Sequence, residues 1–315
     1  MQKDTGNPDN NPVRILVVGT GAVGGFYGSR LDQAGAEVTT VHRSDYTTVL
    51  ESGIHIDSID GPAHFRPKRV LRNVADYGDF PDYILVTLKS LPALDIASII
   101  APAVGPGTTI FLLQNGVDIE QPICNRFPDN EIVSGLAFIC VSRSRPGQIS
   151  HLCHGRLVIG SYPSGITPAV RQLAELFKKS KTPCPVSDSI VLERWRKLLW
   201  NAPFNPISVL TRTDTVQIMA QPEIVVLARE IMEEVCAVSN SLGHFLPQEA
   251  IEKNLAETRK MRPYRTSMLL DYEAGRPMEI EAIVGNIIKA AKNNGVKVPR
   301  LETMYSLLKL TASRK

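Results

Sequence analysis

A glycine-rich segment near the start of the chain has the residue types and spacing of a phosphate-binding loop. Gly19, Gly21 and Gly24 follow the G-x-G-x-x-G pattern, directly after an apolar run at 13–18 and before a helical pattern. Glycines at these positions permit a tight turn, a close approach to a pyrophosphate and close packing of helix on strand. The segment therefore predicts a dinucleotide site in which free N–H groups face an anion. The expected contacts are Gly19, Thr20, Gly21, Ala22, Val23 and Gly24.

The residue at the end of the next expected strand indicates which dinucleotide is bound. Sites that prefer NAD usually place Asp or Glu about 20 residues after the loop, where the carboxylate binds the ribose 2′-hydroxyl. Here Arg43 lies 19 residues after Gly24, and a guanidinium pairs with a 2′-phosphate. The sequence therefore favours NADP(H), while the nearby Asp45 leaves contact with a ribose hydroxyl open.

The apolar segments place this loop in an α/β domain. Strand and helix patterns alternate over the first part of the chain, which predicts a mostly parallel sheet covered on both faces. The expected strands are 13–18, 38–41, 83–88, 108–113 and 132–141. From about Ser187 helical patterns dominate, and the expected helices are 189–202, 222–242, 247–259, 279–294 and 300–311.

The change of pattern follows a Pro-rich connector at 181–186 and defines the expected domains. We expect a Rossmann-type, doubly wound α/β domain at 13–186, followed by an all-α domain at 187–315. Residues 1–12 lack the apolar segment of a secretory signal and are expected to form a disordered polar tail.

The composition narrows the classes of ligand. The 315 residues include 35 Lys+Arg and 32 Asp+Glu, for a formal net charge of +3, and the basic residues are scattered among acidic ones. Gross charge therefore gives no argument for nucleic acid or an anionic membrane. No apolar run approaches the roughly 18 to 20 residues that cross a bilayer, so no membrane span is expected. Small polar substrates and cofactors remain.

Soft metal ligands are present but scattered. Five cysteines stand far apart, at positions 124, 140, 153, 184 and 236, which favours free thiols in a reducing compartment over a disulfide framework. We therefore expect a cytoplasmic protein. His151, Cys153 and His154 lie close together, but no second cluster follows at a zinc-like spacing. We therefore expect a strand-and-turn segment near the end of the first domain rather than a metal site.

Four motifs together make the chain, from residue 13 onward, resemble the ketopantoate reductase (2-dehydropantoate 2-reductase) family. They are GTGAVGG at 19–25, LVTLK at 85–89 with LQNG at 113–116, ERWRKLLWNAPFNP at 193–206, and SMLLDYEAGRPMEI at 267–280. The resemblance implies a Rossmann-type domain followed by a helical domain. It also implies an oxidoreductase that reduces a 2-oxo acid with NADPH, specifically 2-dehydropantoate to (R)-pantoate in pantothenate biosynthesis, and a homodimer is possible.

The resemblance also implies roles for particular residues. Lys197 matches the general acid, and Glu279 matches the active-site carboxylate, which lies close to the cofactor as well. The positions matching substrate contacts are Asn115, Asn201, Asn205 and Ser267. Lys89 and Asn115 match positions on the cofactor side. The chemistry explains these types, because hydride addition to a carbonyl places negative charge on oxygen, and an ammonium can both stabilise that charge and supply the proton.

The spacing of the second-domain residues gives partial support for a site between the domains. Lys197 and Asn201 are four apart and share a helix face, which Asn205 joins if the helix passes Pro203. Without the family resemblance, the sequence favours a solvated helix charge over a catalytic role for Lys197. Two other functions stay open: reduction or oxidation of another 2-oxo or 3-hydroxy acid, and a non-catalytic NADP-binding sensor.

Overall fold

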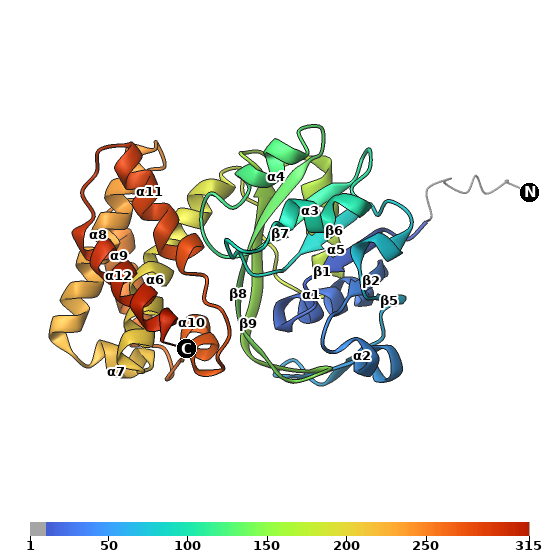
Figure 1. The fold of residues 1–315 in the computed structure, drawn as a ribbon, viewed down its shortest axis with the longest axis horizontal. Coiled ribbons are helices and arrows are strands. Elements are labelled where there is room, and N and C mark those ends of the chain that lie inside the picture. Colours follow the sequence, from blue (N-terminus) through green and yellow to red (C-terminus); the bar gives the residue numbers. More distant parts are fainter. Residues whose placement is uncertain (1–10, 315) are drawn as a thin grey trace, which may run out of the picture.

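A nine-stranded sheet and a separate group of helices form the two parts of the structure, and the long hairpin of the sheet lies between them (Figure 1). This computed structural model describes residues 11–314, so most of the predicted tail at 1–12 lies outside the described residues. The arrangement confirms the predicted fold class, an α/β Rossmann-type unit followed by a helical unit. The boundary at 186 stays a prediction.

The sheet is mixed, with parallel strands at its centre. Its order is β4-β3-β9-β8-β7-β6-β1-β2-β5. The strands are β1 (Arg14–Val18), β2 (Glu37–Val41), β3 (Ile54–Ser58), β4 (Ala63–Phe65), β5 (Arg69–Leu71), β6 (Tyr83–Val86), β7 (Thr109–Leu113), β8 (Ile132–Arg145) and β9 (Gln148–Ser161). β1 pairs in parallel with β2 on one side and β6 on the other, so the chain changes direction across the sheet at β1. Ligands of such sheets bind at the carboxyl ends of strands beside this switch point.

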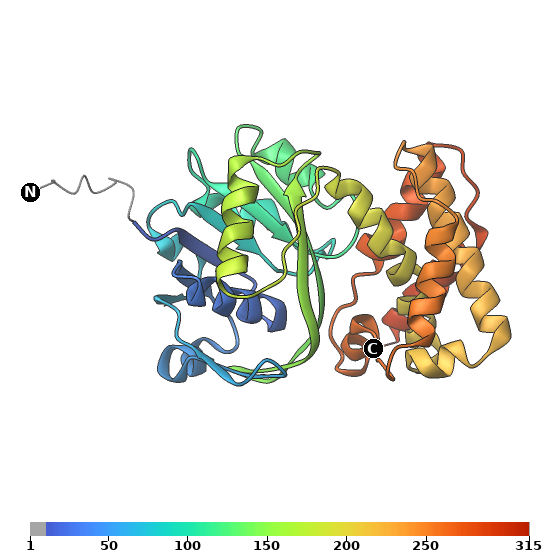
Figure 2. The ribbon, with the colours of Figure 1, turned by 180° about the vertical axis from the view of Figure 1, so that it is seen from behind.

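Alternating side chains of the strands fill the two faces. Ile15 and Val17 pack into the core beneath α1 (Ala22–Gln33) and α5 (Pro168–Lys179), the face turned to the viewer in Figure 2. Leu16 and Val18 point to the opposite face and its own apolar core. That face carries α3 (Ile96–Ile100) and α4 (Gln121–Arg126), while α2 (Tyr46–Ser52) follows β2. The period of two in β1 therefore builds both layers.

The helical part is organised around one long helix. α6 (Ile190–Thr211) packs against several of the other helices and is buried over most of its length. The remaining elements are α7 (Thr215–Met219), α8 (Pro222–Ser241), α9 (Glu249–Arg259), α10 (Ser267–Glu273), a π-helical turn (Glu281–Gly285), α11 (Asn286–Asn293) and α12 (Pro299–Ser313). No helix among residues 11–314 is long and apolar enough to cross a membrane.

Two elements extend well beyond the bounds expected from the sequence. α6 continues to Thr211 rather than ending at 202, with Pro203 and Pro206 inside it. A proline costs a helix one hydrogen bond and introduces a steric clash, but Ala202, Phe204 and their neighbours on α6 are buried in the helical core, and that packing supports the helix. The strand expected at 132–141 extends to Arg145. β3, β4 and β5 were not predicted as strands, and only the 151–154 part of β9 was expected, as a strand-and-turn segment.

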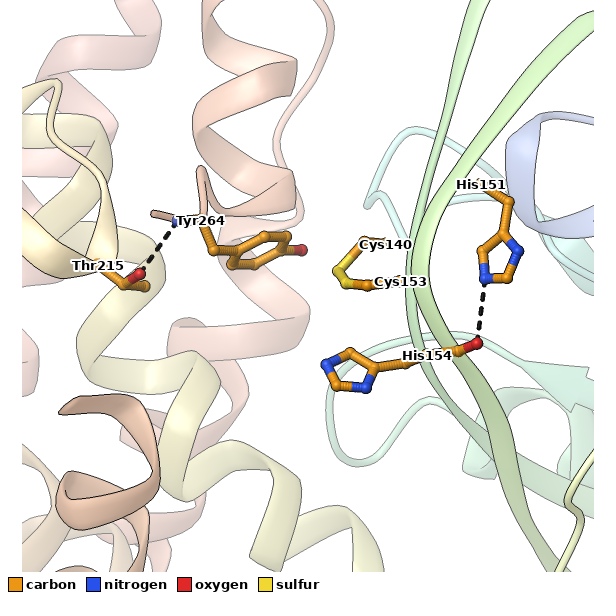
Figure 3. Close-up of a disulfide and its surroundings, with 6 residues drawn as sticks. All are labelled: Cys140, His151, Cys153, His154, Thr215 and Tyr264. Atoms are coloured by element: carbon orange, nitrogen blue, oxygen red, sulfur yellow. Dashed lines mark hydrogen bonds between the residues drawn. A yellow bond between two sulfur atoms is a disulfide. The ribbon is translucent and has the colours of Figure 1, made fainter. Parts of the chain in front are cut away.

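The long hairpin corrects the expectation that all cysteines are free. β8 and β9 place Cys140 opposite Cys153, with a Cα–Cα distance of 5.0 Å, and the two sulfurs form a disulfide (Figure 3). Pairing of strands, which spacing in the sequence does not show, creates this contact. Cys124, Cys184 and Cys236 are free.

The same hairpin brings His154 beside the disulfide. Its ring nitrogen and the two sulfurs lie within 4.8 Å of one another, and the ring of Tyr264 points towards the sulfurs from the helical part (Figure 3). Cysteine binds metal as a thiolate. Cys140 and Cys153 offer no thiolate while they form the disulfide. The absence of a metal site stays a prediction.

Candidate active site

The glycine loop lies at the carboxyl end of β1, where α1 begins. Gly19 has φ of +99°, and a Cβ there would lie 2.5 Å from the backbone nitrogen of Leu88. A Cβ at Gly24 would lie 2.4 Å from Oγ1 of Thr87. These contacts leave room only for glycine, so the turn and the helix start sit tightly on β6 and its following loop.

The start of α1 suits an anion. No side chain caps this helix, and its first turn holds no acidic residue. The N–H groups of its first turn, from Ala22 onward, have no partner within the helix, and only Gly19 O approaches the Cβ position of Gly21 within 4 Å. A pyrophosphate fits such a site because it accepts these hydrogen bonds and is stabilised by the helix dipole.

Two charged residues after β2 behave differently. The side chain of Arg43 is exposed. Asp45 is buried, with its carboxylate 3.2 Å from Nδ1 of His42 and accepting a hydrogen bond of 3.0 Å from Arg143. Burial disfavours ionisation of Asp45, but the hydrogen bond with His42 and the charge on Arg143 outweigh it and lower the pKa of Asp45. The Asp45 carboxylate therefore has its partners within the protein, in His42 and Arg143.

A second arginine at this edge was missed by the sequence analysis. Arg72 directly follows β5, which runs parallel to β2 with Leu71 opposite Val41. Its guanidinium carbon lies 3.9 Å from the centre of the Tyr46 ring. Only the pairing of β5 with β2 places Arg72 at this edge. The sequence did not indicate it, because β5 is three residues long and was not predicted.

Lys197 reaches from α6 to the sheet. Its Nζ donates hydrogen bonds to Oδ1 of Asn115 at 2.9 Å and to the carbonyl oxygen of Ala137 at 2.6 Å. Asn115 lies just after β7, and its Nδ2 donates to Oε2 of Glu279 at 3.3 Å. The backbone N–H of Ser90 donates to the other oxygen of Glu279 at 2.9 Å. Lys197, Asn115 and Glu279 thus form one hydrogen-bonded chain across the two parts.

The surroundings shift the pKa values of both ends of this chain. Burial, with additional repulsion from Arg194 and Arg156, lowers the pKa of Lys197 to about 7, although Glu279 opposes the shift. Burial raises the pKa of Glu279, while hydrogen bonds from Ser90 and Asn115 limit the rise. A lysine with a pKa near neutrality exchanges its proton readily, which is the property a general acid needs.

Lys89 lies beside this chain but contacts the helical part. Its Nζ is 2.7 Å from a carboxylate oxygen of Asp271 and donates to the carbonyl oxygen of Pro277 at 2.8 Å. Asp271 also pairs with Arg276. Lys89 therefore joins the loop after β6 to the segment that leads to Glu279, and sequence reasoning missed Asp271 as its partner.

The other predicted substrate residues are placed separately. Asn201 and Asn205 are buried on α6, at successive four-residue steps from Lys197. Oδ1 of Asn205 is one of two buried side-chain polar atoms without a hydrogen-bond partner in residues 11–314. Ser267 is exposed at the start of α10. In the described chain, no hydrogen bond links these three side chains to Lys197 or Glu279.

A buried ion pair that sequence reasoning missed fixes α6 against the sheet. Nε of Arg194 pairs with Glu120, and both side chains are 1% exposed. The same guanidinium donates to the carbonyl oxygens of Gln114 at 2.8 Å and Gly116 at 3.1 Å, on either side of Asn115. Arg194 therefore sets the position of Asn115 relative to Lys197, which lies one helical turn away.

Comparison with known proteins covers both parts of the chain. The family model for ketopantoate reductase PanE/ApbA matches residues 15–164, and the model for its C-terminal domain matches residues 189–312. A 2-dehydropantoate 2-reductase of Nostoc sp. is 34% identical, covering 96% of this chain and 97% of the relative. The crystal structure of a 2-dehydropantoate 2-reductase from Methylococcus capsulatus is 45% identical, with a TM-score of 0.90 and coverage of 96% and 97%.

More distant structures share the fold. D-mandelate dehydrogenase, solved with NADH and anilino(oxo)acetate, is 21% identical with a TM-score of 0.88, covering 96% of this chain and 99% of that one. A dimeric ketopantoate reductase from Staphylococcus aureus is 22% identical with a TM-score of 0.79, covering 96% and 99%. At these identities the likeness concerns the fold alone.

Proposed function

Since this chain belongs to the ketopantoate reductase family, we propose that it reduces 2-dehydropantoate to (R)-pantoate with NADPH. The observation that carries the proposal is the hydrogen-bonded chain of Lys197, Asn115 and Glu279, between the strand ends that hold the glycine loop and the helical part. Such a chain offers a proton donor with a tuned pKa and polar groups that position it.

The reaction divides the work between cofactor and protein. Bound NADPH supplies a hydride to the carbonyl carbon. The Lys197 ammonium donates a hydrogen bond to the carbonyl oxygen, stabilises the negative charge that grows there, and then transfers its proton. Asn115 and the carbonyl oxygen of Ala137 hold Nζ of Lys197 in place.

The remaining site residues bind and orient in this proposal. Glu279 fixes Asn115 through their hydrogen bond and accepts a second hydrogen bond from the substrate hydroxyl. Asn201, Asn205 and Ser267 bind polar groups of the substrate from the helical side, and the free Oδ1 of Asn205 supports this role. Lys89, which pairs with Asp271 in this structure, would bind on the nicotinamide side of the cofactor.

The choice of NADPH rests on the edge of the sheet after β2. Arg43 is exposed there, whereas the Asp45 carboxylate is directed to His42 and Arg143. Arg72 adds a second guanidinium at the neighbouring strand end. Two guanidinium groups without a free carboxylate favour a 2′-phosphate over a 2′-hydroxyl.

We expect Arg43→Ala to raise the KM for NADPH about ten- to a hundredfold, because a charge-assisted contact to the 2′-phosphate is lost. The KM for NADH should change little. Steady-state kinetics with both cofactors measures this, and Arg171→Ala, an exposed arginine of α5, is the control. Equal losses with the two cofactors would exclude Arg43 as the discriminating residue.

The pH dependence should follow Lys197. Because burial lowers its pKa to about 7, the donor is protonated below that pH and neutral above it. We expect kcat/KM for reduction to fall about tenfold per pH unit above pH 7, whereas kcat/KM for pantoate oxidation should rise about tenfold per pH unit below pH 7 and level off above it. Profiles measured in both directions test this. A reduction rate that is flat to pH 9 would assign the proton to another group.

Turnover of the purified protein with NADPH and a panel of 2-oxo acids, and with NADP+ and a panel of 3-hydroxy acids, separates the alternatives. We expect the highest kcat/KM with 2-dehydropantoate. Preference for another acid would keep the chemistry and change the substrate. NADPH binding without turnover of any acid would favour a sensor.

Other properties follow as proposals. We expect a homodimer. We also expect a location in the cytoplasm, which is supported by the proposed use of NADPH and no longer by the cysteines, since two of them form a disulfide. We also retain the domain boundary after residue 186, since α6 begins at Ile190.

A further inference from the structure

An arginine on the wall of the hairpin stands close to Lys197, and no residue within 11–314 gives it a partner of opposite charge. Arg156 of β9 lies opposite Phe138 of β8, and its guanidinium carbon is 3.9 Å from the centre of the Phe138 ring. Its side chain is exposed, and within residues 11–314 its guanidinium makes no hydrogen bond or ion pair.

The same ring links Arg156 to the proton donor. Nζ of Lys197 lies 5.2 Å from the centre of the Phe138 ring, so the two cationic groups are at most about 9 Å apart. The positive charge of Arg156 also disfavours protonation of Lys197. Two neighbouring cations that share one ring raise the energy of the empty site, and an anion between them lowers it.

The chemistry of the substrate supplies that anion. In a 2-oxo acid the carboxylate is bonded to the carbon that accepts the hydride. When the carbonyl oxygen contacts Lys197, the carboxylate, which is bonded to the carbonyl carbon, must therefore also lie close to Lys197. It then faces either the hairpin or the helices. A guanidinium stacked flat on an aromatic ring keeps its N–H fork free for the two oxygens of a carboxylate.

We propose that Arg156 binds the carboxylate of the substrate and thereby makes the site specific for 2-oxo acids over neutral carbonyl compounds. This inference rests on the proposed function. Arg156 acts together with the polar side chains of the helical part, which approach the substrate from the other side.

The first test is Arg156→Leu in the full chain. We expect the KM for 2-dehydropantoate to rise about ten- to a hundredfold, because a hydrogen-bonded charge pair is lost, with a smaller change in kcat and unchanged NADPH affinity. Arg156→Lys should recover part of the loss, since it keeps the charge but not the fork. Arg145→Leu, at the tip of the same hairpin, is the matched control.

The second test changes the charge of the substrate. The wild type should prefer 2-dehydropantoate to its uncharged amide by about ten- to a hundredfold in kcat/KM, and Arg156→Leu should lose this preference. A merely structural role would not alter it. The alkaline limb of the pH profile should also move to higher pH in Arg156→Leu, because the repulsion that Arg156 exerts on the Lys197 ammonium is lost. Arg194 and Glu279, the other charges that act on Lys197, stay the same.

Calorimetric binding of pantoate to the NADP complex separates the two claims. If the wild type turns over 2-dehydropantoate and binds pantoate, but Arg156→Leu keeps the same KM, the same affinity and the same preference for acid over amide, this inference is wrong. If the wild type neither turns over 2-dehydropantoate nor binds pantoate, the proposed function fails first, and the inference with it.

Discussion

Lys197→Ala should lower kcat about 10²- to 10⁴-fold, the range that general acid catalysis commonly contributes. The interaction that is lost is strongest in the transition state, where the carbonyl oxygen becomes negative, so kcat and kcat/KM should fall together. NADPH affinity should stay nearly unchanged, because the cofactor binds chiefly through the glycine loop and the residues after β2.

Single-turnover and steady-state kinetics of Lys197→Ala measure this loss, with NADPH binding followed by fluorescence. Lys178→Ala is the matched control, because Lys178 is an exposed helix lysine with a side chain 77% exposed. A Lys197→Ala enzyme that keeps near wild-type kcat on 2-dehydropantoate would show that Lys197 is only a half-buried structural lysine.

The largest effect on stability is expected at Glu120. Glu120→Ala leaves the guanidinium of Arg194 buried without its carboxylate, and loss of one partner from a buried pair costs about 3–5 kcal/mol in the free energy of unfolding. The partner carbonyls of Gln114 and Gly116 remain but do not neutralise the charge. Because Arg194 also positions Asn115, activity should fall at temperatures where the variant is still folded.

Chemical denaturation of Glu120→Ala measures this change. Glu252→Ala removes the acid of an exposed pair with Arg229, with 59% of the Glu252 side chain accessible, and should change stability little. Glu120→Gln with Arg194→Met removes both charges and should recover part of the loss. Equal stability of Glu120→Ala and Glu252→Ala would contradict the importance of the buried pair.

Local patterns predicted the elements that depend on neighbours in the sequence. The glycine loop was predicted because the turn, the phosphate contacts and the start of the helix fall within a few residues. The long helices α8 and α12 were predicted nearly to their ends, since burial on one side repeats every three to four residues. The family resemblance added the residues of the helical part, whose roles spacing alone does not indicate.

Features that depend on distant pairing were missed for a common reason. β9 is antiparallel to β8 and alternates polar with apolar side chains irregularly, with register shifts between the two strands. Without that pairing, neither the disulfide nor the position of Arg156 against Phe138 can be predicted. The ion pair of Arg194 and Glu120 likewise joins residues 74 positions apart.

The central claim is direct hydride transfer from NADPH to the carbonyl carbon of 2-dehydropantoate. The most direct measurement uses NADPH carrying deuterium at the transferred position and analyses the product by mass spectrometry. We predict pantoate with one deuterium on the carbon that bears the new hydroxyl, next to the carboxylate, formed in equal amount to the cofactor oxidised. Cofactor oxidation without labelled pantoate, or no oxidation at all with 2-dehydropantoate, would contradict the account.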